Sequence, residues 1–230
     1  FWSVPPRQVL PKPYQQPHPP IWVAALQAAT YELAARKGIG VLAMGASDPS
    51  VLEPHITAYH DAVRQATPVG DCVNAQWANQ TIGICTEDNR EGRELGTLSI
   101  KNFFGPDRPY AKGVEDIYSR LLQQWGGVPD HLKEDFIRTG QPPGGEGQSA
   151  EATNFIAHKV WEKVDADTLC DRAVIIAGDP DSCIAALKKH EAAGADQVLI
   201  SMQTDTVPHE VVMKSIELFG KYVIPEFADS

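Results

Sequence analysis

Short apolar runs alternate with amphipathic stretches along most of this chain. Residues 21–25 form a compact apolar run, and further runs lie near 39–44, 73–84 and 196–202, each followed by apolar positions at helical spacing. Runs of this length, bounded by turn residues, are typical of buried strands. Their alternation with helices predicts an α/β fold with parallel strands. A shorter extended piece is expected near 173–177.

The predicted helices have recognisable ends. A helix over 27–37 should stop at Gly38, because glycine readily adopts the left-handed conformation that ends many helices. Asp48 and Asp179 are each followed by proline, a combination typical of a capping residue and a first helical turn. Pro208 should begin the last helix. These features are expected to serve packing and not catalysis.

The turn after the first run is a candidate phosphate site. The first N–H groups of a helix lack partners within the helix, and the helix dipole favours an anion at that end. A phosphate could therefore bind where the chain passes from strand to helix at Leu26 and Gln27. Gln27 and Thr30 would be the side-chain donors.

Composition excludes several classes of protein. The 230 residues are 43% hydrophobic and 22% charged, as in an ordinary soluble globular protein. A formal charge of −10 disfavours nucleic acid as a partner, and no run of about 18 apolar residues predicts a membrane span. The seven histidines show no metal-pair spacing and the four cysteines form no CxxC pair, so no metal site is expected. Without a signal-like start, the cysteines are interpreted as reduced thiols of a cytoplasmic protein.

Two blocks of sequence carry a family resemblance. The first is PHPPIWVAALQAAT (17–30), which continues through LAARKGIGVL (33–42), and the second consists of the runs 177–184, 190–199, 208–210, 215–219 and 223–225. Together they resemble the bacterial-luciferase-like family of flavin-dependent monooxygenases, in the order of that family's later barrel elements. The resemblance implies a TIM-type (β/α)8 barrel in which the first block grips the flavin phosphate.

The resemblance begins in mid-barrel, and the chain opens without an initiator methionine. About four strand–helix units make half of an eightfold barrel. Residues 1–230 are therefore interpreted as the C-terminal half of a single luciferase-like barrel domain, truncated upstream. A complete small α/β domain with an open parallel sheet is the alternative. A long insertion at about 103–171 corresponds to the family's mobile cover over the flavin, although a simple surface loop would have the same composition.

The resemblance also implies a chemistry. The expected protein is a monooxygenase that uses reduced FMN, supplied by a separate flavin reductase, and O2 to oxygenate a small organic substrate, and that forms a homo-oligomer when intact. Met44 and Gly45 after the second strand and Met202 after the last are candidates for the walls around flavin and substrate. Catalytic residues are not assigned, because the family's acid–base histidines would lie largely upstream.

Two other functions remain open. The first is a deazaflavin- or flavin-dependent dehydrogenase or reductase on the same barrel, since a fold does not fix a chemistry. The second is a non-catalytic flavin-binding protein or an inert half-barrel. Because half a barrel leaves two strand edges unpaired, the 230-residue chain alone is expected to bind flavin poorly.

Overall fold

The computed structural model describes residues 5–8, 10–43, 47–103, 130–131, 133–134, 164–204 and 207–228. Its strands are β1 (Trp22–Ala25), β2 (Gly40–Ala43), β3 (Trp77–Cys85), β4 (Ile176–Gly178) and β5 (Gln197–Ser201). Its helices are α1 (Ala28–Arg36), α2 (Pro49–Val63), α3 (Asn89–Phe103), α7 (Ala166–Asp171), α8 (Pro180–Ala192) and α9 (His209–Leu218). After α9 the chain continues in a π-helical turn (Phe219–Val223) and a 3-10 turn (Ile224–Phe227). None of the described helices is long and apolar enough to cross a lipid bilayer.

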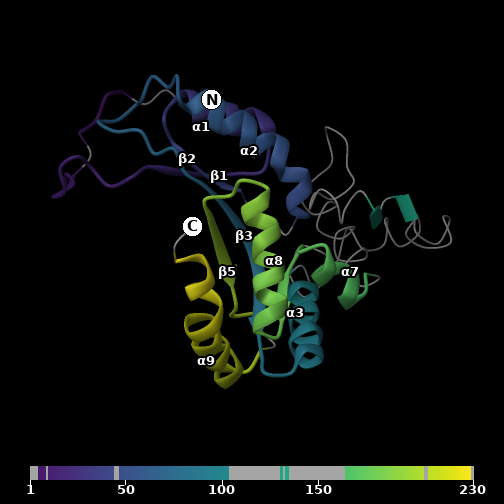
Figure 1. Ribbon diagram of the computed structural model, residues 1–230. Helices are drawn as coiled ribbons and strands as arrows, with labels where there is room; N and C mark the ends of the chain where they lie inside the picture. The colour runs from purple at the N-terminus through teal and green to yellow at the C-terminus, as the bar shows by residue number, and fades with distance from the viewer. Residues whose placement is uncertain are drawn as a thin grey trace, which may run out of the picture.

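All described strand pairs are parallel, as the alternating pattern predicts (Figure 1). β3 is the central strand of the five-stranded sheet. Its first half pairs with β2 on one edge and with β5 on the other, since Ala78 has a partner in each of these strands. Its last three residues pair with β4. The strands expected over 21–25, 39–44, 73–84 and 196–202 are thereby confirmed as neighbours, although the third begins at Trp77 and not at residue 73.

β4 was expected only as an extended piece near 173–177. It begins later, at Ile176, because Ala173 has a left-handed backbone (φ 53°) and makes a turn directly after α7. The structure therefore adds a fifth strand, which extends the sheet at the end of β3.

Helices α1, α2 and α8 cover one face of the sheet. The ring of Trp77 packs edge-on against Tyr31 of α1 and Tyr59 of α2, and Ala193 at the end of α8 belongs to the same buried cluster. Asn79, two residues beyond Trp77 and therefore on the same face, contacts α8. This agrees with helices on the outer side of a barrel wall.

The last helix covers one end of β3. The backbone N–H of Cys85 donates to the hydroxyl of Ser215 at 2.8 Å, and Val212 packs against Ile84. Ser215 is fully buried. It satisfies a backbone donor that no described strand takes up.

Tyr59 ties helix α2 to the amino ends of the strands. Its hydroxyl lies 2.9 Å from the carbonyl oxygen of Ile39 and 3.1 Å from that of Asn74. Burial, with a smaller contribution from the charge of Asp196, raises the pKa of Tyr59 to about 12. The hydroxyl therefore stays protonated and donates.

Replacing Tyr59 with phenylalanine is expected to lower the free energy of unfolding by about 1 kcal/mol, because buried carbonyl oxygens lose their donor. Urea unfolding measures the change. Tyr14→Phe is the matched control, since Tyr14 is fully exposed. Equal stability losses in the two variants would show that the buried hydroxyl contributes nothing.

Candidate functional site

The carboxyl ends of parallel strands gather at one edge of a sheet, where ligands of α/β proteins commonly bind. The segments that follow the strands there begin at Leu26 after β1, Ser47 after the undescribed residues 44–46, Thr86 after β3, Asp179 after β4 and Met202 after β5. This edge is the candidate site.

Helix α1 starts at this edge with its backbone donors exposed. Gln27 is the capping residue, and its side chain makes no capping hydrogen bond. The first bond of the helix is donated by the N–H of Thr30 to the carbonyl oxygen of Gln27 at 2.9 Å, so the N–H groups of Ala28 and Ala29 precede it. No acidic residue lies in the first turn. An anion would therefore meet only donors and the positive end of the helix dipole.

The other described helix starts are occupied or acidic. Carboxylates of this chain accept backbone N–H bonds at the starts of four of them: Asp48 at α2, Asp88 at α3, Asp165 at α7 and Asp179 at α8. Helix α9 carries Glu210 in its first turn. Among the described helices, α1 alone offers an anion both free donors and no repelling carboxylate.

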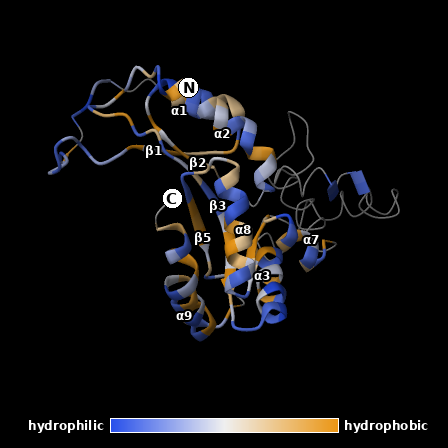
Figure 2. Ribbon diagram, in the orientation of Figure 1, coloured by the Kyte–Doolittle hydropathy of each residue, from blue (hydrophilic) through white to orange (hydrophobic). Residues whose placement is uncertain are grey.

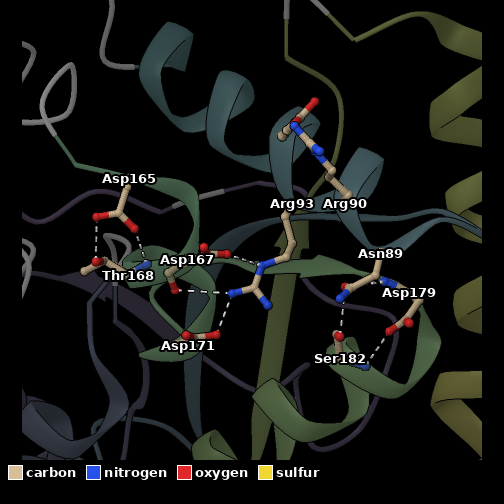
Figure 3. A network of polar contacts seen from close by, with 10 residues as sticks. Asn89, Arg90, Arg93, Asp165, Asp167, Thr168, Asp171, Asp179 and Ser182 are labelled. Atoms are coloured by element: carbon tan, nitrogen blue, oxygen red, sulfur yellow. Dashed lines mark hydrogen bonds and ion pairs between the residues drawn. The ribbon is translucent and has the colours of Figure 1, made fainter.

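A polar network fixes the ends of β3 and β4 (Figure 3). The side-chain oxygen of Asn89 accepts from the backbone N–H of Asp179 at 3.3 Å and from the hydroxyl of Ser182 at 2.9 Å. In the same view Arg93 of α3 forms ion pairs with Asp167 and Asp171 of α7. The sequence predicts the cap at Asp179, but nothing in its pattern indicates Asn89 or Arg93, whose partners lie far along the chain.

The end of β2 is held by an ion pair. Asp48 accepts from the N–H of Ser50 at 3.0 Å and from Nε of Arg172 at 2.9 Å. Burial alone would raise the pKa of the Asp48 carboxyl, but these hydrogen bonds and the charge of Arg172 outweigh it and lower the pKa. Arg172 also pairs with Glu134 at 2.8 Å. The charge of Arg172 is therefore neutralised within the chain, and its guanidinium is not free to bind an anion.

The predicted site residues fall into separate groups. Leu26, Gln27 and Thr30 lie together at the start of α1, where Leu26 and Gln27 are exposed. Met202 lies after β5, which β2 and β3 separate from β1. It packs against two buried apolar clusters, so its contacts in this chain are those of a core residue. Met44 and Gly45 lie outside the described residues, as does most of the expected cover over 103–171.

Thr204, two residues beyond Met202, is buried, and its hydroxyl has no hydrogen-bond partner among the described residues. A buried hydroxyl without a partner calls for an explanation, and a bound polar group is one.

The four cysteines are free thiols. Burial raises the pKa of Cys170 to about 11, so it is an unreactive core thiol.

Comparison with known proteins agrees with this architecture. A sequence profile of the luciferase-like monooxygenases matches residues 1–197. The chain is similar to the monooxygenase RslO1 from Streptomyces bottropensis, with 21% identity over 95% of this chain and 51% of that one (TM-score 0.56). It is also similar to the coenzyme F420 dependent tetrahydromethanopterin reductase from Methanopyrus kandleri, with 22% identity over 90% and 51% of the two chains (TM-score 0.53).

A third similar structure is the oxygenating constituent of 3,6-diketocamphane monooxygenase from Pseudomonas putida, a type II Baeyer-Villiger monooxygenase in complex with FMN. It shows 17% identity over 91% of this chain and 49% of that one, with a TM-score of 0.53. No curated protein sequence matches the chain. The chain spans about half the length of these solved structures. The expected fold class is confirmed, and the chain belongs to the luciferase-like monooxygenase family.

Proposed function

We propose that this chain is the flavin-binding part of a monooxygenase that uses reduced FMN and O2 to oxygenate a small organic substrate. The observation that carries the proposal is the start of α1, which lies at the carboxyl edge of a parallel sheet with free donors and no carboxylate. Phosphate is the part of FMN that such a helix start recognises. The similarity to an FMN-bound monooxygenase supports the choice of cofactor.

Different residues of this chain would contact the phosphate, the flavin ring and the substrate. The N–H groups of Ala28 and Ala29 and the hydroxyl of Thr30 would hold the phosphate, while Met44, Gly45 and Met202 would border the flavin ring and the substrate. A separate flavin reductase would deliver the reduced FMN. When bound, reduced FMN would supply the electrons that activate oxygen. The protein would orient the substrate and exclude water.

A deazaflavin-dependent dehydrogenase or reductase is the second candidate. A coenzyme F420 dependent reductase shares the fold at a similar TM-score. The start of α1 would serve either cofactor, because FMN and the deazaflavin would both present a phosphate to it. Substrate-dependent oxygen uptake with reduced FMN would support the monooxygenase, whereas hydride transfer to or from the deazaflavin without oxygen uptake would support the alternative.

Gln27→Glu tests the phosphate site. In the complete protein it places a negative charge at the start of α1, so FMN should bind about tenfold more weakly than to the complete wild-type protein, because the new charge repels the phosphate and offsets the attraction of the helix dipole. Riboflavin, which lacks the phosphate, should bind equally to both. Thr30→Val should weaken FMN binding by about 1 kcal/mol or more, since a hydrogen bond to a charged group is lost. Equilibrium titration monitored by flavin fluorescence gives all these affinities.

Gln65→Glu is the matched control, because it makes the same charge change at an exposed position just beyond the end of α2, near the opposite edge of the sheet. It should leave FMN affinity unchanged. If FMN and riboflavin bind the complete wild-type protein equally well, or if Gln27→Glu does not alter its FMN affinity, the phosphate is not bound at α1.

A further inference from the structure

Two cysteine side chains meet at the carboxyl end of β3. Cys85 is the last residue of β3, and its partner in the neighbouring strand β4 is Gly178. Cys183 lies near the start of α8, and its sulfur lies 4.0 Å from the carbonyl oxygen of Gly178. The two thiols are hydrogen-bonded to each other. Residues that are far apart in the sequence therefore form a thiol pair.

Hydrogen bonds hold the segments on both sides of the pair. The backbone N–H of Thr86 donates to the carbonyl oxygen of Gly178 at 3.0 Å, which keeps the end of β3 on β4. The hydroxyl of Ser182 donates to the side-chain oxygen of Asn89 at 2.9 Å, which fixes the start of α8 (Figure 3). The two thiols are thereby kept close together, and small side-chain rotations would bring the sulfurs to the S–S bond length of about 2 Å.

Hydrophobic residues surround the pair. Both cysteines are fully buried, and residues of β5 and α8 belong to the same cluster, among them Val198, Ile200 and Ala186. Figure 2 shows hydrophobic residues along β5 and on part of α8. Such surroundings exclude a charged or bulky oxidant more strongly than a small neutral one, because a charge loses its hydration there. Hydrogen peroxide is both small and neutral.

The two thiols also differ in acidity. The hydrogen bond from Cys183 lowers the pKa of Cys85, although burial and the charge of Asp179 oppose this effect. The same hydrogen bond, together with burial, raises the pKa of Cys183. The thiolate is the nucleophilic form of cysteine. Cys85 is therefore the thiol that would react first with an oxidant, with Cys183 in place to react second.

We propose that Cys85 and Cys183 form a site of reversible oxidation, at which hydrogen peroxide joins the two thiols as a disulfide. The sulfur of Cys85 first takes one oxygen from the peroxide: an S–O bond forms, the O–O bond breaks, and the other oxygen leaves as water with the thiol proton. The sulfur of Cys183 then attacks that of Cys85, so that an S–S bond forms, the S–O bond breaks and a second water leaves. Two thiols thus lose two electrons, and one peroxide is reduced to two waters.

The disulfide would join the end of β3 covalently to α8. Both elements border the edge at which the candidate site lies, because β3 ends there and α8 begins there. A dithiol would restore the two thiols by exchange. The inference goes beyond the proposed function and does not rest on it, since it requires neither a flavin nor the start of α1.

Peptide mapping of the complete protein by mass spectrometry tests the proposal. The protein is treated with hydrogen peroxide in the absence of denaturant, its remaining thiols are blocked with N-ethylmaleimide, and it is then digested. We expect peptides joined through Cys85 and Cys183, and we expect dithiothreitol to separate them. Cys72→Ala is the matched control, because Cys72 is half-buried and lies in neither β3 nor α8. This variant should form the same disulfide.

Serine variants separate the roles of the two thiols, because serine keeps a hydrogen-bond donor but cannot form a disulfide. In Cys183→Ser, dimedone should label the sulfenic acid that accumulates on Cys85. In Cys85→Ser, dimedone should label Cys183 about tenfold more slowly or not at all, since its thiol ionises less readily. Circular dichroism establishes that both variants fold.

Three results would overturn the proposal. The first is that Cys85 and Cys183 both stay reduced in the wild-type protein at peroxide concentrations that oxidise Cys72. The second is a disulfide from either residue to Cys72 or Cys170 in place of the expected pair. The third is that dimedone labels Cys183 in Cys85→Ser as fast as it labels Cys85 in Cys183→Ser.

Discussion

Gly92→Ala is expected to lower the free energy of unfolding by about 3 kcal/mol, at the upper end of what overpacking costs. Helix α3 packs directly on β4 at this position. A Cβ atom on residue 92 would lie 2.6 Å from the carbonyl oxygen and 2.7 Å from the Cα of Gly178. Both are backbone atoms, which cannot rotate away, so α3 or β4 must move and the sheet end must distort.

Gly220→Ala is the matched control. A Cβ atom there meets nothing within 4 Å, so the change should be neutral or slightly stabilising through the lower entropy of the unfolded chain. Urea unfolding of the two variants and the wild-type chain measures the difference. Equal losses would show that α3 does not pack on β4 through Gly92.

His190→Leu is expected to lower the free energy of unfolding by about 3 kcal/mol at pH 7.5, because it leaves two buried polar groups without partners. Nδ1 of His190 lies 3.0 Å from the side-chain nitrogen of Asn79, and Nε2 lies 3.0 Å from the carbonyl oxygen of Ala173. The side-chain oxygen of Asn79 accepts in turn from the indole N–H of Trp77 at 2.7 Å. The amide of Asn79 and the carbonyl of Ala173 lose their partners when the imidazole is removed.

The stability loss in His190→Leu should also depend on pH. Burial lowers the pKa of His190, although the Ala173 carbonyl and the charge of Asp48 oppose this, so the imidazole is neutral in the folded chain. Below about pH 6.5 the unfolded chain binds a proton that the folded chain does not. The wild-type chain therefore loses stability as the pH falls from that value toward the lower folded pKa, and the difference between wild type and variant should shrink.

Denaturant unfolding at a series of pH values provides this comparison. His209→Leu serves as the control, because His209 is exposed at the start of α9. A difference between wild type and His190→Leu that stays constant from pH 7.5 to acidic pH would contradict a neutral buried imidazole.

The sequence predicts most of the local structure, because local structure depends on neighbouring residues. Gly38 ends α1 with a left-handed backbone (φ 66°), and Asp179 caps α8 through the N–H of Ser182, as the pattern indicates. The contacts between distant residues are a different matter. Asn79 and His190 are 111 positions apart, and their sequence neighbourhoods resemble those of ordinary strand and helix residues.

The candidate site shows the same division. The start of α1 is readable because strand, turn and helix follow one another within residues 21–37. Met202 is harder to interpret, because a methionine after a strand can border a ligand or fill a core, and only the packing around it distinguishes the two. Arg172 could not be paired with Asp48 from the sequence, since 124 residues separate them.

Arg93 of α3 holds α7 in place through ion pairs with Asp167 and Asp171, and this arrangement affects how the connection between the two helices can evolve. The chain leaves the described sheet region at the end of α3 and returns through α7, the helix that Arg93 holds by Asp167 and Asp171. Descendants of this gene could thus lengthen, shorten or exchange the intervening stretch while the strands keep their partners, since each doubling of a connection costs only about 0.6 kcal/mol.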